Sequence, residues 1–576
     1  ASDVYKRQIM DNVTFTPPAI ANLKDMLNKS AMLYGEKDAY QIKNSDGTFT
    51  HYTYKDVLNM VQGLGTGLIN MGLKGQKIAI IGENRIEWEI AYLAIVCGVG
   101  IVVPIDKTLP ENELKSVIER SEVSAIFYSE KYKDALTRIK FGGQNNLRHL
   151  ISMDQEKHSG GVYSQKELTE YGNHLIDAGF NEYIDAKINP YTMNIMLFTS
   201  GTTSQSKVVA LSQYNICSNL LDIDKILDIS YEDIFLSFLP LNHVFECTVG
   251  FLFPIYKGAK IVFADSARRI VKNLHDYKVT FLACVPAMYE KIFEHVNKAL
   301  DKAGKQKNIV KLKKLHKHDS MEKKKEIFSY IHDMLGGNIR YLISGAAPLD
   351  RDYERRYREL GLNLLQAYGL TETSPVVSMA NEENYKLGSV GKPAPSVEAR
   401  IANPDANGIG ELVVKGPNVM MGYYANAEAT AQVLQNGWFH TGDLAKIDED
   451  GFIFICGRQK NVIVLKNGKN IFPEEMEAIV NKIEGVQESL IYGKQHGADK
   501  DDLRIHVKIV YDPETMERVY HLTDEKEIQQ ALFQEVKAIN RTLPVYKAIR
   551  GVVVSKEPLI KTATNKVKRL EEMKTL

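Results

Sequence analysis

The chain has 576 residues, of which 44% are hydrophobic and 25% charged, a composition typical of a globular protein with several hydrophobic cores. Basic and acidic residues balance at 72 each, so no net charge attracts the chain to nucleic acid. The five cysteines form no paired motif and are expected to be buried thiols in a reducing compartment. The longest nearly apolar stretch, residues 91–105, is too short to cross a bilayer. We therefore expect a cytoplasmic protein that has no nucleic-acid partner.

The N-terminal part of the chain alternates between helical and strand patterns. Residues 19–34 and 54–71 have helical spacing, and the turn at 44–47 lies between two short strand patterns, which predicts a hairpin. Apolar strands then alternate with amphipathic helices, as in α/β proteins with a parallel sheet. These strands are expected at 77–81, 101–104 and 125–128.

A polar loop at residues 199–207 separates two apolar segments and is a candidate binding site. Hydroxyl groups, backbone N–H groups and a lysine can together surround a polyanion such as the phosphates of a nucleotide. The candidate residues are Thr199, Ser200, Gly201, Thr202, Thr203 and Lys207. The loop is not a Walker motif, because Ser206 and Val208 flank Lys207 where that motif has glycine and then serine or threonine. A surface turn rich in serine and threonine is the alternative interpretation.

Three further apolar strands run into polar or glycine-containing loops, and such strand ends mark the edge of an α/β sheet where ligands bind. The first strand, expected to reach residues 239–241, is followed by His243, which by itself is more typical of a structural histidine. The second strand leads into a loop at residues 345–347. The third leads into Tyr368 and Gly369.

Two later regions differ from the rest in composition or in the length of their expected strands. Residues 302–325 are rich in lysine; we interpret them as a solvated helical face, with contact to anionic lipid headgroups as the alternative. After Gly388 the strands are short and separated by turns, and from Arg458 a compact β/α unit follows. We therefore predict two domains, at residues 1–457 and 458–576.

Six motifs occur in the order and approximate spacing of the adenylate-forming superfamily, which includes acyl-CoA synthetases, luciferases and adenylation domains. They lie at residues 199–207, 345–348, 368–372, 442–443, 457–460 and 564–566. The resemblance extends from about Asn22 to Arg569. Within the superfamily the chain most resembles bacterial long-chain fatty acid–CoA ligases, through residues 285–291 and 467–475.

The resemblance implies both a fold and an activity. The implied fold is α/β, with a large N-terminal domain of layered α/β sheets, a small β-barrel-like subdomain and a small mobile α+β C-terminal domain. The implied reaction begins when a carboxylate attacks the α-phosphorus of ATP to give acyl-AMP and pyrophosphate; the thiol of coenzyme A then displaces AMP. Both reactants of the first step are anions, so the site must neutralise charge and align them. The implied ligands are a fatty acid, ATP with Mg²⁺, and coenzyme A.

The resemblance also implies roles for individual residues. Thr371 is expected to hold the α-phosphate, Glu372 to bind Mg²⁺, and Lys566 to reach between the carboxylate and the α-phosphate, as the catalytic residues. Lys460 falls at the family's hinge position, where one residue absorbs a domain rotation. The expected ATP- and AMP-binding residues are Thr199, Ser200, Gly201, Thr202, Thr203, Lys207, Gly345, Ala346, Ala347, Tyr368, Gly369, Thr371, Asp443, Arg458 and Lys566. The expected acyl pocket includes His243, Phe245 and Cys247.

Three positions depart from the family's pattern, where glycines are usual. Asn565 tolerates a left-handed backbone and Ser204 costs little at negative φ, whereas the β-branched Val208 cannot adopt positive φ cheaply. Val208 therefore leaves open a nucleotide-binding relative with little turnover. A carrier-protein phosphopantetheine in place of coenzyme A also stays open, because both thiols end the same arm.

Overall fold

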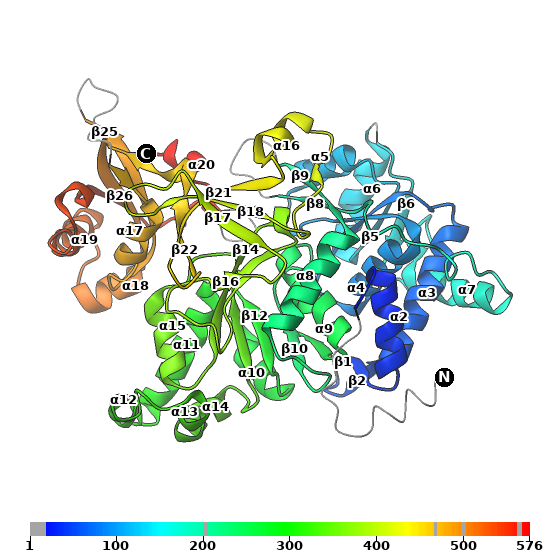
Figure 1. The fold of residues 1–576 in the computed structure, drawn as a ribbon, viewed down its shortest axis with the longest axis horizontal. Helices are drawn as coiled ribbons and strands as arrows, with labels where there is room; N and C mark the ends of the chain where they lie inside the picture. The colour runs from blue at the N-terminus through cyan, green and yellow to red at the C-terminus, as the bar shows by residue number, and fades with distance from the viewer. Residues whose placement is uncertain (1–18, 144, 200–205, 466–468, 497–502, 562–566) are drawn as a thin grey trace.

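The computed structural model describes residues 19–143, 145–199, 206–465, 469–496, 503–561 and 567–576 (Figure 1). Two large sheets with their helices form most of the chain, a small antiparallel sheet follows, and an α+β unit ends it (Figure 1). The predicted α/β class with layered sheets is confirmed. Among the described helices, none combines the length and the apolar character that a bilayer crossing requires.

The first large sheet carries the two ends of the predicted polar loop at its edge. Its order is β19-β9-β8-β4-β3-β5-β6-β7, with a parallel core that includes the three strands predicted first. Antiparallel pairing of β8 with β9 brings Thr199 and Lys207 together, and the Thr199 N–H donates to the Lys207 carbonyl at 2.9 Å. The bounds are β3 (Lys77–Ile81), β4 (Ile101–Pro104), β5 (Ala125–Tyr128), β6 (His149–Ser152), β7 (Tyr163–Ser164), β8 (Met193–Phe198), β9 (Val208–Ser212) and β19 (Gly422–Tyr423).

The second large sheet has a parallel core with antiparallel strands at both ends. Its order is β16-β15-β14-β13-β12-β10-β11-β1-β2, so the predicted N-terminal hairpin extends a sheet built mainly from the middle of the chain. The bounds are β1 (Asp38–Lys43), β2 (Phe49–Thr53), β10 (Ile234–Ser237), β11 (Lys260–Phe263), β12 (Phe281–Cys284), β13 (Tyr341–Ser344), β14 (Leu364–Gly369), β15 (Val376–Met379) and β16 (Lys392–Pro393).

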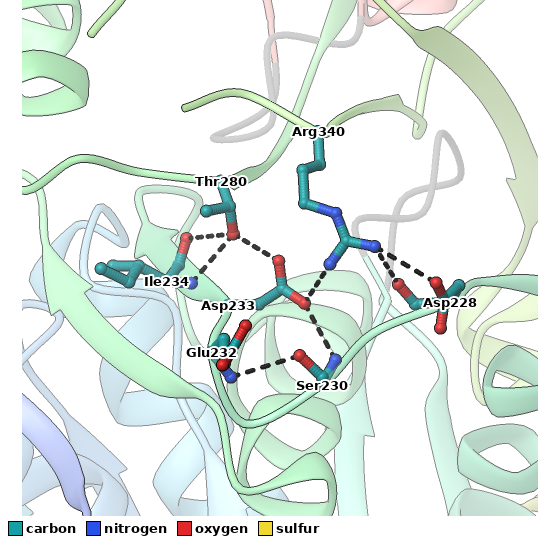
Figure 2. Close-up of polar contacts among 7 residues, drawn as sticks. All are labelled: Asp228, Ser230, Glu232, Asp233, Ile234, Thr280 and Arg340. Atoms are coloured by element: carbon teal, nitrogen blue, oxygen red, sulfur yellow. Dashed lines mark hydrogen bonds and ion pairs between the residues drawn. The ribbon is translucent and has the colours of Figure 1, made fainter. Parts of the chain in front are cut away.

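A buried aspartate ties together the amino ends of three neighbouring strands in the second sheet. Asp233, which is 1% exposed, immediately precedes β10. Its carboxylate accepts hydrogen bonds from Thr280 Oγ1 at 2.7 Å and from Arg340 Nη1 at 2.6 Å, just before β12 and β13 (Figure 2). The Ser230 backbone N–H donates to the same carboxylate at 2.9 Å (Figure 2). These donors offset the cost of burying the charge, so the network fixes the amino edge of the sheet.

Helices cover the sheets and approach closely where glycines meet. A Cβ on Gly172 of α7 would lie 1.8 Å from the carbonyl oxygen of Gly63 on α3, so a side chain there would drive the helices apart. The helices are α2 (Leu23–Tyr34), α3 (Tyr54–Asn70), α4 (Ile86–Ala94), α5 (Glu111–Ser121), α6 (Lys133–Phe141), α7 (Gln165–Asp177), α8 (Gln213–Ile226), α9 (Phe253–Lys257), α10 (Ile270–Asp276), α11 (Pro286–Lys302), α12 (Gln306–Leu315), α13 (Met321–Ile327), α14 (Ser329–Met334), α15 (Arg351–Glu359) and α16 (Ala427–Val433).

The expected strand at residues 239–241 is wrong. β10 ends at Ser237, because Pro240 has no N–H for a strand ladder and the side chain of Asn84 takes over the local hydrogen bonding. Asn84 Nδ2 donates to the Leu239 carbonyl at 2.7 Å. The chain then turns into the π-helix η3 (Glu246–Leu252).

A five-stranded antiparallel sheet follows the large sheets. Its longest strand, β21, pairs with β18, β20 and β22, and a turn at 448–451 joins β21 to β22. The bounds are β17 (Glu398–Ala402), β18 (Gly410–Lys415), β20 (Leu434–Gln435), β21 (Trp438–Ile447) and β22 (Ile453–Arg458).

The C-terminal unit has a hydrophobic core of its own, which includes Val507, Ile509 and Leu532. It lies beside the large sheets (Figure 1). Lys482 contacts Asp350 at 3.2 Å and Asp352 at 3.0 Å at the start of α15. Its elements are β23 (Ile463–Val464), β24 (Asn470–Ile471), α17 (Pro473–Val480), β25 (Val486–Gln495), β26 (Leu503–Tyr511), α18 (Pro513–Thr515), α19 (Glu525–Asn540), β27 (Ile549–Ser555) and α20 (Arg569–Met573).

Candidate active site

A tyrosine, an aspartate and an arginine from three strands meet near the carboxyl end of β14. The Tyr368 hydroxyl donates to Asp443 Oδ2 at 2.6 Å, and Arg458 Nε lies 2.7 Å from Asp443 Oδ1. The side chain of Asp443 is 5% exposed, whereas that of Arg458 is 40% exposed. Burial and the adjacent Asp443 carboxylate raise the pKa of Tyr368, so its phenol stays protonated. The cluster presents fixed carboxylate oxygens, which suit hydroxyl donors such as those of a ribose.

The loop that follows β13 opens at the same edge, because β13 and β14 are adjacent and parallel. Gly345 lies against Phe245, and a Cβ on Gly345 would be 3.0 Å from that ring. Ala346 has φ +67°, a left-handed conformation that is uncommon for a residue with a side chain and occurs often at ligand sites. Ala346 and Ala347 are exposed, so their backbone can flank a planar ring.

A cation and a carboxylate are joined through one tyrosine that the sequence analysis did not select. Lys207 Nζ lies 4.5 Å from the centroid of the Tyr423 ring, and the Tyr423 hydroxyl donates to Glu372 Oε1 at 2.9 Å. Burial and the Glu372 charge raise the pKa of Tyr423, which keeps it a donor. Tyr423 reaches this position because β19 pairs with β9, next to Lys207. The arrangement places a positive and a negative side chain around one tyrosine, and a complex of a metal ion with a polyphosphate needs both charges.

Two further predicted residues lie between this pair and the Tyr368 cluster along the chain. Gly369 is the last residue of β14, and Thr371 begins the short helix η5 (Thr371–Thr373); both are half-buried. Glu372 belongs to the same short helix, and its carbonyl accepts the Met420 N–H at 2.8 Å. The structure thus brings Lys207 and Glu372 together, and separately Tyr368, Asp443 and Arg458.

Val208 is not strained, although its β-branched side chain departs from the family's pattern. It begins β9, pairs with Phe198 and is absent from the described residues with positive φ. Its side chain is buried in a hydrophobic cluster with Met196. The expected penalty at this position therefore does not arise.

Several predicted residues lie outside the described residues: Ser200, Gly201, Thr202, Thr203 and Lys566. Lys561 and Val567, on either side of the last of these, form an antiparallel bridge. Lys460 lies in the exposed 3₁₀ turn η6 (Gln459–Asn461), between β22 and β23.

The three predicted acyl-pocket residues follow the end of β10. The His243 carbonyl accepts the Cys247 N–H at 2.9 Å, so both belong to the turn that starts η3. Phe245 is half-buried and lies against Gly345, as described above. Cys247 is buried next to the Tyr92 hydroxyl, and burial raises the pKa of its thiol.

Glu372 is the carboxylate that fits Mg²⁺, because hard cations prefer oxygen ligands and its Oε2 is not engaged by Tyr423. Within the described part of the chain, no three His, Cys, Asp or Glu residues gather into a metal-binding cluster. Mg²⁺ that arrives with a polyphosphate needs only one or two protein carboxylates, so the donor set fits that mode of binding.

Tyr423 could not be recognised from the sequence alone. The only local signal was an aromatic pair after a glycine, at residues 422–424, and such pairs are common in strands. Its importance depends on the pairing of β19 with β9, which joins residues that are distant along the chain.

The chain is similar to several known proteins. Residues 27–424 match the family described as AMP-binding enzyme. Long chain acyl-CoA synthetase 3 of Arabidopsis thaliana is 30% identical over 78% of this chain and 72% of its own length. The long-chain-fatty-acid–CoA ligase of Escherichia coli is 28% identical over 85% of this chain and 86% of its own length. ATP-bound MatB from Rhodopseudomonas palustris has a similar fold, with a TM-score of 0.73, 24% identity and coverage of 96% and 99% of the two chains.

Proposed function

Because the chain belongs to the AMP-binding enzyme family, we propose that it joins a long-chain fatty acid to coenzyme A in two steps driven by ATP. In the first step the fatty acid carboxylate displaces pyrophosphate from ATP to give acyl-AMP. In the second step the thiol of coenzyme A displaces AMP to give the thioester. The curated relatives described as long-chain acyl-CoA synthetases support this choice of acid and thiol.

The observation that carries the proposal is the meeting of Lys207, Tyr423 and Glu372 from three distant segments. A cation 4.5 Å from the tyrosine ring and a carboxylate 2.9 Å from its hydroxyl form the charge pattern that a magnesium–ATP complex requires. Lys207 neutralises the β- and γ-phosphates, Thr371 holds the α-phosphate, and Glu372 offers an oxygen to Mg²⁺. When bound, Mg²⁺ stabilises negative charge on the phosphate oxygens.

The second cluster holds the nucleoside in this proposal. Asp443 accepts the ribose hydroxyls while Arg458 fixes its carboxylate, which is nearly fully buried. The Tyr368 ring and the backbone of Gly345, Ala346 and Ala347 flank the adenine. Nucleoside and phosphates are then held at two separate points, which aligns the α-phosphorus for attack.

The C-terminal residue Lys566 completes the first step in this proposal, by bridging the fatty acid carboxylate and the α-phosphate. Its charge must then leave, so residues 458–576 rotate against 1–457 about Lys460 before the thiol enters. The separate hydrophobic core of residues 463–554 and the exposure of Lys460 support this motion. The three residues after β10, His243, Phe245 and Cys247, border the acyl chain.

The decisive experiment combines the protein with ATP, Mg²⁺, coenzyme A and a series of acids, and measures AMP and thioester. Each buried methylene contributes about 0.8 kcal/mol, so extending the acid from octanoate to tetradecanoate should contribute about 5 kcal/mol, roughly three to four orders of magnitude in kcat/KM. We expect the maximum between about twelve and eighteen carbons. Acetate, benzoate or octanoate that equals tetradecanoate below its micellar concentration would contradict the proposed acid.

The same assay distinguishes the alternatives left open by the sequence. Acyl-AMP formation without thioester, restored by a phosphopantetheine carrier protein, would change the acceptor from coenzyme A. Binding of ATP with no AMP formed from any acid would identify a nucleotide-binding relative without turnover.

We also propose that residues 302–325 contact anionic lipid headgroups, where the substrate acid is concentrated. Helices α12 and α13, in green at the bottom of Figure 1, carry the lysines, and Val310 and Leu315 between them are 48% and 72% exposed. Sedimentation with phosphatidylglycerol vesicles tests the contact. Lys311→Glu with Lys314→Glu should abolish it, whereas the charge-matched control Lys526→Glu with Lys537→Glu on α19 should not. Equal loss in both would mean that only net charge matters.

A further inference from the structure

Glu246 is a fully buried carboxyl group beside the proposed acyl pocket. It is the first residue of the π-helix η3, next to Phe245 and Cys247, and it is 0% exposed. Within the described part of the chain no ion pair involves it, and its Oε2 has no hydrogen-bond partner. Burial raises the pKa of Glu246 to about 8, so the group is a neutral acid at physiological pH.

The other carboxyl oxygen ties η3 to the end of β10. Oε1 accepts hydrogen bonds from Ser237 Oγ at 2.8 Å and from the Phe238 N–H at 3.2 Å. Asn84 Nδ2 donates to the same Ser237 hydroxyl at 2.9 Å, so the network extends to the start of α4. The turn that contains His243 lies between the two points tied together by Glu246.

The Glu246 carboxyl group occupies space that a side chain at residue 250 would otherwise fill. A Cβ on Gly250, one π-turn further along η3, would lie 2.7 Å from the Glu246 carboxyl carbon. Any side chain at residue 250 would displace the group. The glycine therefore allows the carboxyl to fold back toward β10.

Among the residues that the structure describes, the titratable groups that interact electrostatically with Glu246 are buried, and none of them is a cation. Glu89 on α4 and Cys284 on β12 interact electrostatically with it, as does Cys247 on η3. Glu89 accepts a hydrogen bond from the Tyr40 hydroxyl at 2.6 Å, and burial raises its pKa, so it is neutral too. Lys257 at the end of α9, which packs against η3, is paired with Asp224 of α8.

The turn fixed in this way reaches the nucleotide side of the site. Phe245 precedes Glu246 and lies against Gly345, whose loop is proposed to flank the adenine. Thr248, two residues after Glu246, donates from its hydroxyl to the Ser374 carbonyl at 3.3 Å, next to the η5 helix that carries Thr371 and Glu372. A shift of the first turn of η3 would therefore move both the acyl-pocket side chains and their contact with the nucleotide loops.

We propose that Glu246, in its neutral form, is the positioning residue of the acyl pocket, and that its ionisation disorders the pocket and weakens fatty acid binding. This inference rests on the proposed function and adds a specificity-determining residue to it. An ionised carboxylate with an unpartnered oxygen cannot stay desolvated, so the turn from 243 to 246 must open to admit water. In the nucleotide cluster the Asp443 carboxylate is paired with Arg458, so that cluster should not respond in the same pH range.

The test uses fatty-acid-dependent exchange of pyrophosphate into ATP, because this half-reaction avoids the titrating thiol of coenzyme A. In the wild-type protein kcat/KM for tetradecanoate should fall about tenfold per pH unit above pH 8, through KM for the acid, with KM for ATP unchanged. Glu246→Gln keeps an acceptor but cannot ionise, so its activity should match the wild type at pH 7 and show no such fall. Glu246→Ala should raise KM for the acid about tenfold at pH 7.

Glu354→Gln is the matched control, because Glu354 is also a buried acid with raised pKa, two donors on one oxygen and an unpartnered second oxygen. In Glu354→Gln, kcat/KM for tetradecanoate should still decrease above pH 8 as it does in the wild type. The inference would be overturned, with the proposed function intact, if kcat/KM for tetradecanoate decreased above pH 8 in Glu246→Gln as in the wild type. Equal changes in KM for ATP and KM for the acid in Glu246→Ala would have the same consequence. Wild-type protein without any acid-dependent exchange would overturn it together with the proposed function.

Discussion

Asp443→Asn tests the proposed nucleoside contact most directly. The aspartate accepts from the Tyr368 hydroxyl and pairs with Arg458, and its side chain is 5% exposed. The amide keeps the size and one acceptor oxygen but replaces the other oxygen with a donor. That new N–H donor faces either the Arg458 guanidinium or a ribose hydroxyl, both of which are donors, so a hydrogen bond to the carboxylate is lost.

The expected loss follows from the number and kind of hydrogen bonds. A hydrogen bond to a charged group contributes about 1.5–3 kcal/mol to stability or binding. Since Arg458 is 40% exposed, part of the lost attraction is recovered by solvent, and we take the lower half of that range. A loss of about 2 kcal/mol corresponds to a dissociation constant for AMP about 30-fold higher than in the wild type.

Calorimetric titration with AMP measures this change without requiring catalysis. Asp448→Asn is the control, because Asp448 lies in the turn of the same β21–β22 hairpin and pairs with Lys386 at 2.6 Å. Its affinity for AMP should match the wild type. An Asp443→Asn protein with the unfolding transition of the wild type, and with a dissociation constant for AMP within threefold of the wild-type value, would refute the assignment of Asp443 to the ribose.

Four other changes test the remaining assignments. Lys566→Ala should slow acyl-AMP formation about a hundredfold or more but leave thioester formation from supplied acyl-AMP intact, as separate half-reaction assays would reveal; equal losses would contradict its role in the first step. Lys460→Pro should preserve pyrophosphate exchange and stop thioester formation, because proline fixes φ at the hinge. Glu372→Gln should raise the half-saturating Mg²⁺ concentration of the exchange reaction, and an unmoved value would mean that ATP alone holds the metal. Arg340→Met should lower the free energy of unfolding by about 2 kcal/mol in urea, after allowance for the arginine's partial exposure, because Asp233 keeps only its two neutral donors.

The sequence was sufficient for the elements whose patterns are local. The strands at 77–81, 101–104 and 125–128 occur where expected, because short apolar runs between amphipathic helices leave few alternatives. The strand expected at 239–241 failed, because a continuous apolar run hides the effect of Pro240 and of Asn84, which is distant in sequence. A local sequence pattern also does not show which distant segments of the chain a residue contacts in the folded protein.

The candidate site divides along the same line. Asp443, Arg458 and Tyr368 were selected by resemblance, and the structure brings Tyr368 and Arg458 each within hydrogen-bonding distance of the Asp443 carboxylate. Tyr423 and Glu246 were missed, since neither belongs to a polar motif and each matters through contacts with segments far along the chain. Their importance is set by packing, which a single sequence does not display.

The pairing of β19 with β9 bears on how the protein is made. A nascent chain that has emerged only to residue 421 contains all strands of the first sheet except β19. One edge of β9 therefore stays unpaired until Gly422 and Tyr423 emerge. Exposed strand edges recruit other chains, so we expect the growing polypeptide to be prone to aggregation during this interval and to need protection by a chaperone. The residues that finally cover the edge also bring Tyr423 to Lys207, so the ribosome completes the sheet and the proposed phosphate site in the same stretch of synthesis.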